Sequence, residues 1–200
     1  MLLDHDRDLH ALLLERCIPG VHLSAEGGDA ALDVLIELLP RLWVPAGPPI
    51  GTLADEAAWW AGDLEERFER AGRPFDRALL DIALDALRDL PASQGEQVLI
   101  HQDLHADNVL RATREPWLAI DPKPLVGERE FSVAPIVRSH ELGDSRASVP
   151  HRFDRLTAEL GLDRARARLW TIAQTLAWAF DEDEVDPWHL QVVEWLAGSA

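Results

Sequence analysis

The chain has 200 residues, a net charge of −17 and a single cysteine, Cys17. This length fits one domain, or one large lobe with a small one. The acidity argues against a nucleic-acid partner, which requires basic surface, and favours cationic partners or simple solvation. A lone cysteine excludes an internal disulfide framework and fits the cytoplasm, where we expect the protein. No apolar run is long enough to span a membrane, and the N-terminus lacks a signal-peptide pattern, so we expect no membrane contact.

The first apolar run, Leu12 to Arg16, predicts a short buried strand that enters a turn at Pro19-Gly20. No preceding segment offers this strand a pairing partner, and an unpaired apolar edge is a liability for a folded protein. We therefore expect structure upstream of this strand.

Most of the remaining chain shows apolar side chains at helical spacing. Proline-containing stretches at residues 45–49 and at Pro91 end two of these segments. Four tryptophans within them are expected in the core: Trp59, Trp60, Trp170 and Trp178. The predicted helices span residues 29–42, 53–71, 76–90, 133–138, 148–161, 163–180 and 187–196. Asp76 and Asp163 are expected to cap the N-termini of two of them.

Residues 98–123 differ from this helical pattern, because three short apolar runs alternate there with polar turns. The runs predict strands, and their ends carry Asp103, Asn108 and Asp121. Strand–loop–strand geometry can bring such ends together. The fold class is therefore α+β and mostly helical, with a few short strands that carry the polar residues.

These three residues fit the chemistry of phosphoryl transfer. Oxygen donors from Asp and Asn suit magnesium, and a further carboxylate can orient an acceptor hydroxyl. His101, Asp103 and Asn108 have the His-x-Asp-x-x-x-x-Asn spacing of the protein-kinase catalytic loop, and Asp121 ends the following strand. The resemblance to that loop implies Asp103 as the catalytic base and Asn108 and Asp121 as metal ligands.

The resemblance to a known family is specific in two segments. Residues 101–110, HQDLHADNVL, resemble the catalytic loop of aminoglycoside phosphotransferases. Residues 117–128, WLAIDPKPLVGE, resemble the streptomycin and hydroxyurea branch of that family. The resemblance implies the helical C-terminal lobe of a protein-kinase-like fold, with ATP and Mg²⁺ as cofactors. It also implies transfer of phosphate to a hydroxyl of a small molecule, an aminoglycoside or hydroxyurea.

Residues 12–17 resemble the hinge between the two lobes of such kinases, so Glu15 and Cys17 are expected to contact adenine through their backbones. The resemblance divides the chain into a hinge and N-lobe remnant (1–20) and a C-lobe (21–200). The only lysine is Lys123, and there is no G-x-G-x-x-G motif, so we expect the N-lobe to be largely missing. Lys123 itself either contacts phosphate or pairs with a surface carboxylate.

The sequence marks the residues that would contact the substrate less clearly than the catalytic loop. Residues 181–184 form an acidic run that either attracts a cationic, hydroxylated substrate, through Asp181 and Glu182, or is simply an exposed loop. Trp188 follows closely and is a candidate for stacking on the ligand. The sequence does not indicate an oligomeric state.

Two alternatives remain open. His101, Asp103 and His105 alternate along an extended segment and could form the metal cluster of a hydrolase. The chain could instead be a truncated, non-catalytic remnant that binds a cationic ligand, because no phosphate-gripping lysine precedes Lys123.

Overall fold

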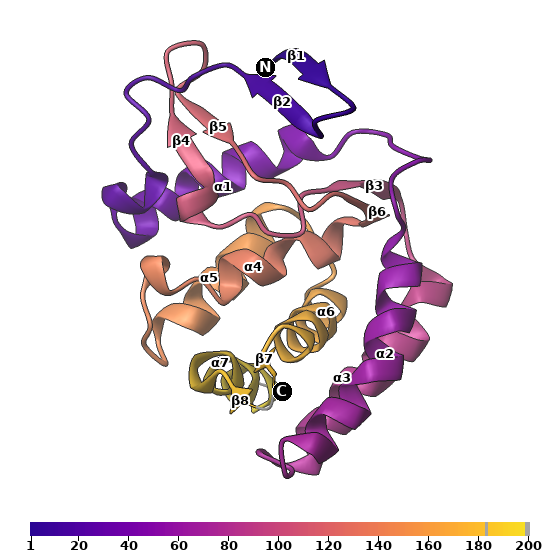
Figure 1. Ribbon diagram of the computed structural model, residues 1–200. Coiled ribbons are helices and arrows are strands. Elements are labelled where there is room, and N and C mark those ends of the chain that lie inside the picture. The colour runs from indigo at the N-terminus through magenta and orange to yellow at the C-terminus, as the bar shows by residue number, and fades with distance from the viewer. Residues whose placement is uncertain (183, 199–200) are drawn as a thin grey trace.

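The computed structural model describes residues 1–182 and 184–198, with most helices below a layer of short strands (Figure 1). Within the described residues, seven α-helices lie close to the predicted segments. The segment predicted as 163–180 ends three residues early, because the chain turns into a short strand after its C-cap, Trp178. The helices are α1 (Gly28–Leu42), α2 (Leu53–Arg70), α3 (Arg77–Asp89), α4 (Ala134–Val137), α5 (Ser148–Glu159), α6 (Arg164–Ala177) and α7 (Pro187–Ala197).

Side-chain caps explain where four of these helices begin. Thr52, Asp76, Asp163 and Asp186 each accept a hydrogen bond from a backbone N–H in the first turn of α2, α3, α6 and α7, respectively. Such caps satisfy N–H groups that have no partner inside the helix. The caps predicted at Asp76 and Asp163 are therefore confirmed.

Helix α6 lies at the centre of the helical body and contacts α3, α4, α5 and α7. Trp170 on this helix is fully buried and packs edge-on against Phe131. Helices α2 and α3 run side by side along one edge of the body (Figure 1). Across the described residues, no helix combines the length and apolar character that crossing a membrane requires.

In the part of the chain that the structure describes, the strands form four antiparallel pairs. The predicted central strands are present, whereas the segment after residue 123, in which no strand was expected, contributes a further strand, β6. This strand pairs with β3 residue for residue, from Gln97 opposite Glu128 to Ile100 opposite Leu125. The pairs are β1 (Leu2–Asp6) with β2 (Ala11–Leu14), β3 (Gln97–Ile100) with β6 (Leu125–Glu128), β4 (Val109–Arg111) with β5 (Trp117–Ala119), and β7 (Phe180–Asp181) with β8 (Glu184–Val185).

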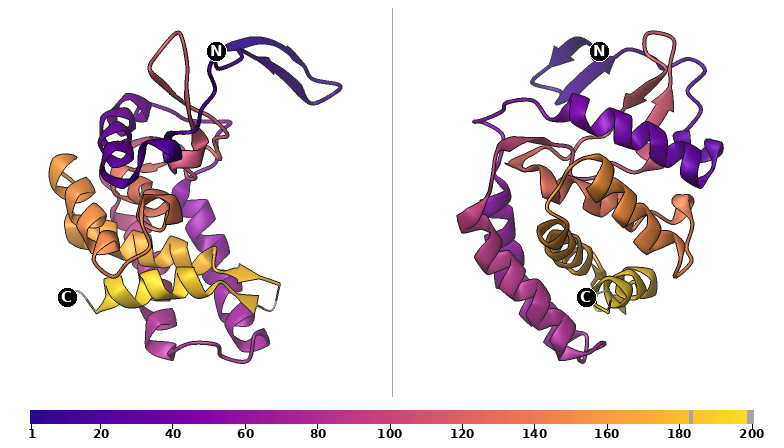
Figure 2. Two further views of the ribbon diagram at one scale, coloured as in Figure 1. Left: turned by 90° about the vertical axis from the view of Figure 1, so that its left-hand side faces the viewer. Right: turned by 180° about the vertical axis from the view of Figure 1, so that it is seen from behind.

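The N-terminal strand corrects one expectation. Strand β2 has a partner within the chain, β1, and the Asp6 carboxylate accepts the N–H groups of Asp8 and Leu9 in the turn between them. The strand is also not buried, because Leu12 is 67% exposed in a hairpin that projects from the body (Figure 2). An apolar run predicts a strand, but whether anything covers it depends on the tertiary structure.

A buried ion pair fastens the strand layer to the helices. Glu128 on β6 is 1% exposed, and its carboxylate accepts hydrogen bonds from Nε of Arg166 at 2.6 and 2.7 Å and from Nε1 of Trp170. Both donors lie on α6. Since a buried carboxylate is stable only when fully paired, this contact fixes where β6 lies against α6.

We therefore expect Glu128→Gln to lower the free energy of unfolding by about 3–5 kcal/mol, because Arg166 would keep a charge without its partner. Urea unfolding followed by tryptophan fluorescence measures this loss. The matched control is Glu96→Gln, whose side chain is 68% exposed and pairs with Arg129. A surface pair of this kind contributes about 1 kcal/mol or less. Equal losses in the two variants would contradict the anchoring role of Glu128.

Candidate active site

The loop after β3 carries Asp103 on a tightly turned backbone. Gln102 has a φ of +65°, a conformation that non-glycine residues adopt rarely and that often marks functional loops. Its carbonyl accepts a hydrogen bond from Nε2 of Gln174 on α6 at 3.1 Å, which holds the turn. The Asp103 side chain that follows is 14% exposed, so it lies at the surface of the loop with limited access to solvent.

Three hydrogen bonds join this loop to the loop after β5. The Nε2 atom of His101 lies 2.9 Å from the carbonyl oxygen of Ile120, and Lys123 donates its backbone N–H to the carbonyl of His101 at 3.0 Å. Ile120 donates its own N–H to the carbonyl of Asn108 at 2.9 Å. The strand ends that carry the polar residues are thereby tied together.

His101 acts as a brace in this arrangement. Its side chain is buried, and burial lowers the pKa of the imidazole, which favours the neutral form at pH 7. A neutral ring whose Nε2 faces a carbonyl carries its proton there and donates it. His101 thus holds the two loops together. Its Nε2 atom is used in this contact and does not serve as a metal ligand.

Asp103 faces two cations. The ammonium group of Lys123 pairs with Oδ2, and Nη2 of Arg138 lies 3.9 Å from Oδ1. Of the two possibilities left open for Lys123, the structure gives it a carboxylate partner, and that carboxylate belongs to Asp103. Both cations also lie against the ring of Trp178, at 5.1 Å for Lys123 and 4.5 Å for Arg138.

Sequence reasoning missed Arg138. It follows α4, 17 residues after Asp121, and no local motif marks it. Burial lowers the pKa of its guanidinium to about 10, and the charge of Asp103 opposes that effect, so Arg138 remains protonated at neutral pH. An arginine within a largely apolar segment was the only signal in the sequence that could have drawn attention to it.

Asn108 and Asp121 provide the oxygen donors that a magnesium ion would need. The side-chain amide of Asn108 donates Nδ2–H to the backbone carbonyl of Asp103 at 2.8 Å, a bond that does not use the amide oxygen. Asp121 is exposed, with a φ of +54° at the end of its loop. Amide and carboxylate oxygens fit the preference of Mg²⁺ for hard ligands.

The geometry does not favour the hydrolase alternative. His105 directs Nδ1 toward Oε1 of Glu141 at 2.8 Å, and His101 is engaged with Ile120. The two imidazoles therefore serve different contacts rather than one metal cluster. Glu141 also accepts the backbone N–H of Ala106 at 3.0 Å. Through these two hydrogen bonds Glu141 holds the loop that carries Asp103.

A cavity of about 210 Å³ connects the predicted hinge with the metal loop. The Glu15 side chain is engaged there by Arg114, at 2.9 Å, so only its backbone could serve a ligand. Cys17 is partly buried and unpaired. The lining includes Leu14, Glu15, Cys17, Leu118, Ile120 and Asp121.

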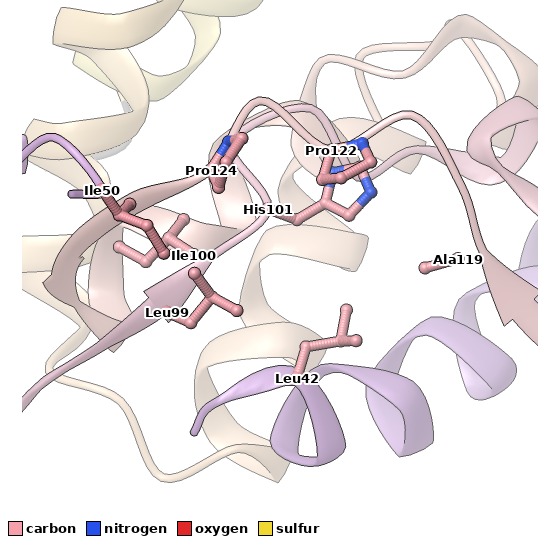
Figure 3. Close-up of a pocket in the computed structure, with 8 residues that line it drawn as sticks. All are labelled: Leu42, Ile50, Leu99, Ile100, His101, Ala119, Pro122 and Pro124. Atoms are coloured by element: carbon pink, nitrogen blue, oxygen red, sulfur yellow. The ribbon is translucent and has the colours of Figure 1, made fainter. Parts of the chain in front are cut away.

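A second pocket, of about 270 Å³, shares Ala119 and Pro122 with the hinge cavity (Figure 3). It is lined almost wholly by apolar side chains from the end of α1, from β3 and from the prolines that flank Lys123. His101 borders it, but Asp103, Asn108 and Asp121 do not. Of these three residues, Asp121 lines the hinge cavity, so the hinge cavity and not the apolar pocket reaches the metal loop.

The expected substrate residues separate into two groups. Asp181 and Glu182 are exposed in the β7–β8 hairpin, which begins shortly after Trp178, whereas Asp183 lies outside the described residues. Trp188 is 8% exposed, donates Nε1–H to the carbonyl of Arg138 at 2.6 Å and stacks on His140 at 4.1 Å. The indole is thus part of the packing behind Arg138, in conflict with its expected role as an open stacking face.

Comparison with known proteins is consistent with this geometry. Residues 1–185 match the model of the family described as aminoglycoside/hydroxyurea antibiotic resistance kinase. Streptomycin 6-kinase from Streptomyces griseus is 40% identical, over 98% of this chain and 67% of that kinase. Hydroxyurea phosphotransferase from Kitasatospora aureofaciens is 40% identical, over 92% of this chain and 55% of that protein.

Among solved structures, choline kinase LicA from Streptococcus pneumoniae has the same fold. It superposes with a TM-score of 0.68 at 14% sequence identity, covering 99% of this chain and 74% of LicA. LicA has also been solved in complex with AMP. At this identity the likeness concerns the fold alone, and it confirms the protein-kinase-like architecture with mixed helices and short strands.

The brace at Glu141 predicts a specific dependence on pH. Burial would raise the pKa of this carboxyl, but the hydrogen bond from His105 and further polar contacts outweigh it and lower the pKa from 4.5 to about 2. A carboxyl whose pKa is lower in the folded state stabilises the fold above its unfolded value and loses that contribution as the pH falls. The contribution should therefore be complete above about pH 4.5 and vanish toward pH 2.

Urea unfolding of the wild type and of Glu141→Gln at a series of pH values tests this. We expect the variant to be less stable by about 2 kcal/mol at neutral pH, because solvent screens part of the full effect. The difference should shrink as the pH falls below about 4.5. Glu37→Gln, at an exposed glutamate on α1, is the control and should show little change. A difference in the free energy of unfolding that stays constant with pH would contradict the stabilising role of the Glu141 carboxylate.

Proposed function

The chain belongs to the aminoglycoside/hydroxyurea antibiotic resistance kinases and is a phosphotransferase, and from its site we propose that it transfers phosphate from ATP to a hydroxyl of a streptomycin-like aminoglycoside. Hydroxyurea is the other acceptor that the relatives suggest. The observation that carries the proposal is that hydrogen bonds join Asp103, Asn108 and the loop of Asp121, and that Asp121 lines the hinge cavity.

ATP enters the cavity between the hinge and the metal loop. The backbones of Glu15 and Cys17 contact the adenine, in the hinge segment that residues 1–20 provide. This orientation directs the phosphates toward Asp121, which lines the same cavity as both hinge residues. Residues 21–200 then form the C-lobe that presents the acceptor.

Asp103 receives the acceptor hydroxyl. Its carboxylate accepts the hydrogen bond of that hydroxyl and orients the oxygen toward the terminal phosphate. It takes the proton as the acceptor oxygen bonds to phosphorus and the bond from that phosphorus to the departing ADP breaks. Lys123 occupies Oδ2 of Asp103 before substrate arrives, and its side chain is 51% exposed. It can therefore leave this carboxylate and contact the phosphate, which carries more negative charge.

Asn108 and Asp121 would hold Mg²⁺ through the amide oxygen and the carboxylate. The ion, when bound, neutralises phosphate charge during transfer. The hydrogen bond from Asn108 Nδ2 to the carbonyl of Asp103 keeps the amide oriented, and the bond from Ile120 keeps the following loop in register.

The acceptor approaches past the acidic hairpin. Asp181 and Glu182 are exposed, and a cationic aminoglycoside would be attracted to them over a distance set by the ionic strength. Trp188 takes no direct part, because its ring is covered by His140. The net charge of −17 supports the same electrostatic preference.

The first test is Asp103→Asn. Loss of the base should reduce kcat by about 10²–10⁴-fold and leave the KM for ATP nearly unchanged. ADP release is measured with streptomycin, a second aminoglycoside and hydroxyurea as acceptors. Asp107→Asn is the matched control, because its carboxylate lies in the same loop but accepts a hydrogen bond from Ser24. Comparable turnover by Asp103→Asn and the wild type would exclude Asp103 as the base.

The second test uses the single cysteine as a reporter of the hinge cavity. ATP with Mg²⁺ should slow the reaction of Cys17 with a thiol reagent by about tenfold at ten times its Kd, because bound nucleotide covers the thiol. Absorbance of the released thiolate measures the rate. Inorganic phosphate is the control and should give no protection. Labelling that is unaffected by saturating ATP would place the nucleotide elsewhere.

A further inference from the structure

Arg138 is a buried charge with an unusual set of partners. Its side chain is 7% exposed, and the carboxylate that faces it, that of Asp103, lies 3.9 Å away, beyond hydrogen-bond reach. A buried guanidinium is costly unless closely paired, and an apolar residue would fill the same space at lower cost. This arrangement is poorly suited to stability alone.

Helix α6 fixes the position of this guanidinium. Nη1 of Arg138 donates to Oε1 of Gln174 at 2.8 Å, and the guanidinium carbon lies 4.5 Å from the ring centre of Trp178. Gln174 and Trp178 are four residues apart, so they lie on one face of the helix. The planar guanidinium is therefore held by a hydrogen bond at one side and by an aromatic face at another.

The same glutamine also reaches the backbone next to Asp103. Nε2 of Gln174 donates to the carbonyl of Gln102 at 3.1 Å, and Gln102 is the residue with positive φ. One side chain on α6 thus holds both the turn before Asp103 and the cation beside its carboxylate. Arg138, Gln174 and Gln102 form a continuous polar connection from the helix to the loop.

Arg138 and Lys123 differ in their freedom to move. Lys123 is 51% exposed and can leave the carboxylate, whereas Arg138 is enclosed by α6 and by Trp188, whose Nε1–H is donated to the carbonyl of Arg138. When Lys123 turns to a phosphate, Arg138 is the cation that stays beside Asp103.

We propose that Arg138 is a positioning residue, held by Gln174 and Trp178, that keeps the carboxylate of Asp103 oriented toward the acceptor hydroxyl. The inference rests on the proposed role of Asp103 in phosphoryl transfer. It assigns Arg138 no contact with substrate. Its effect is on the orientation of the base, and a displacement of about 1 Å at a reacting group can reduce the rate about 10²-fold.

The test compares Arg138→Met, which keeps the volume but removes the charge, with Arg138→Lys, which keeps the charge. Steady-state kinetics with ATP, Mg²⁺ and streptomycin should show kcat reduced about 10²-fold in Arg138→Met and about tenfold or less in Arg138→Lys. The KM values for ATP and streptomycin should stay within about threefold of the wild type. Equal losses in both variants, or an active Arg138→Met, would overturn the inference.

Arg168→Met is the matched control. Arg168 lies on α6 and donates a hydrogen bond to the carbonyl of Leu196 at 3.1 Å, in the contact with α7. Its loss should lower the thermal midpoint without changing kcat. Thermal unfolding of all variants separates a loss of folded protein from a loss of turnover.

Crystal structures of the wild type and of Arg138→Met test the orientation of the Asp103 carboxylate directly, without requiring that the acceptor be known. If the wild type does not phosphorylate streptomycin, the proposed acceptor is wrong, but the comparison still decides the role of Arg138. We expect the Asp103 carboxylate to rotate away from its wild-type position in the variant. A carboxylate that keeps its position, with Lys123 unchanged, would refute the positioning role.

Discussion

The hydrogen bonds between the loop after β3 and the loop after β5 are the constraint on which the candidate site depends. Backbone groups at strand ends must find partners, and here His101, Asn108, Ile120 and Lys123 satisfy one another across the two loops. Burial keeps the imidazole of His101 predominantly neutral, so it can serve as a donor without bringing an unpaired charge into the interior. The relative positions of Asp103 and Asp121 follow from these bonds.

The charge around Asp103 is opposite to that of the whole protein. The chain carries a net charge of −17, yet Lys123 and Arg138 both face the carboxylate of Asp103 and share the ring of Trp178. The acidic surface suits attraction of a cationic acceptor, whereas the local cations suit the phosphates of a nucleotide. The attraction of the acceptor acts through solvent and is screened by salt. The contacts of Lys123 and Arg138 act at short range, where the partly buried surroundings strengthen them.

Local sequence signals predicted much of this structure. Helical spacing and caps such as Asp76 and Asp163 placed the helices, because these signals act within one or two turns. The kinase-like spacing from His101 to Asn108 identified the loop that carries Asp103. The misses were non-local. Leu2–Asp6 pairs with β2, and Trp188 packs behind Arg138 rather than facing a ligand, because contacts distant in sequence decide burial.

The sequence by itself indicated the family, through the resemblance of two short segments, and it indicated the helical elements and the residues proposed for phosphoryl transfer, since motifs and spacing are local properties of the chain. Only the tertiary structure decided that Lys123 and Arg138 lie at Asp103 and that Gln174 joins Gln102 to Arg138. These residues are up to 72 positions apart in the chain, and no periodicity relates them. Their contacts arise because the packing of α6 beneath the loops brings them together, and packing depends on the whole core.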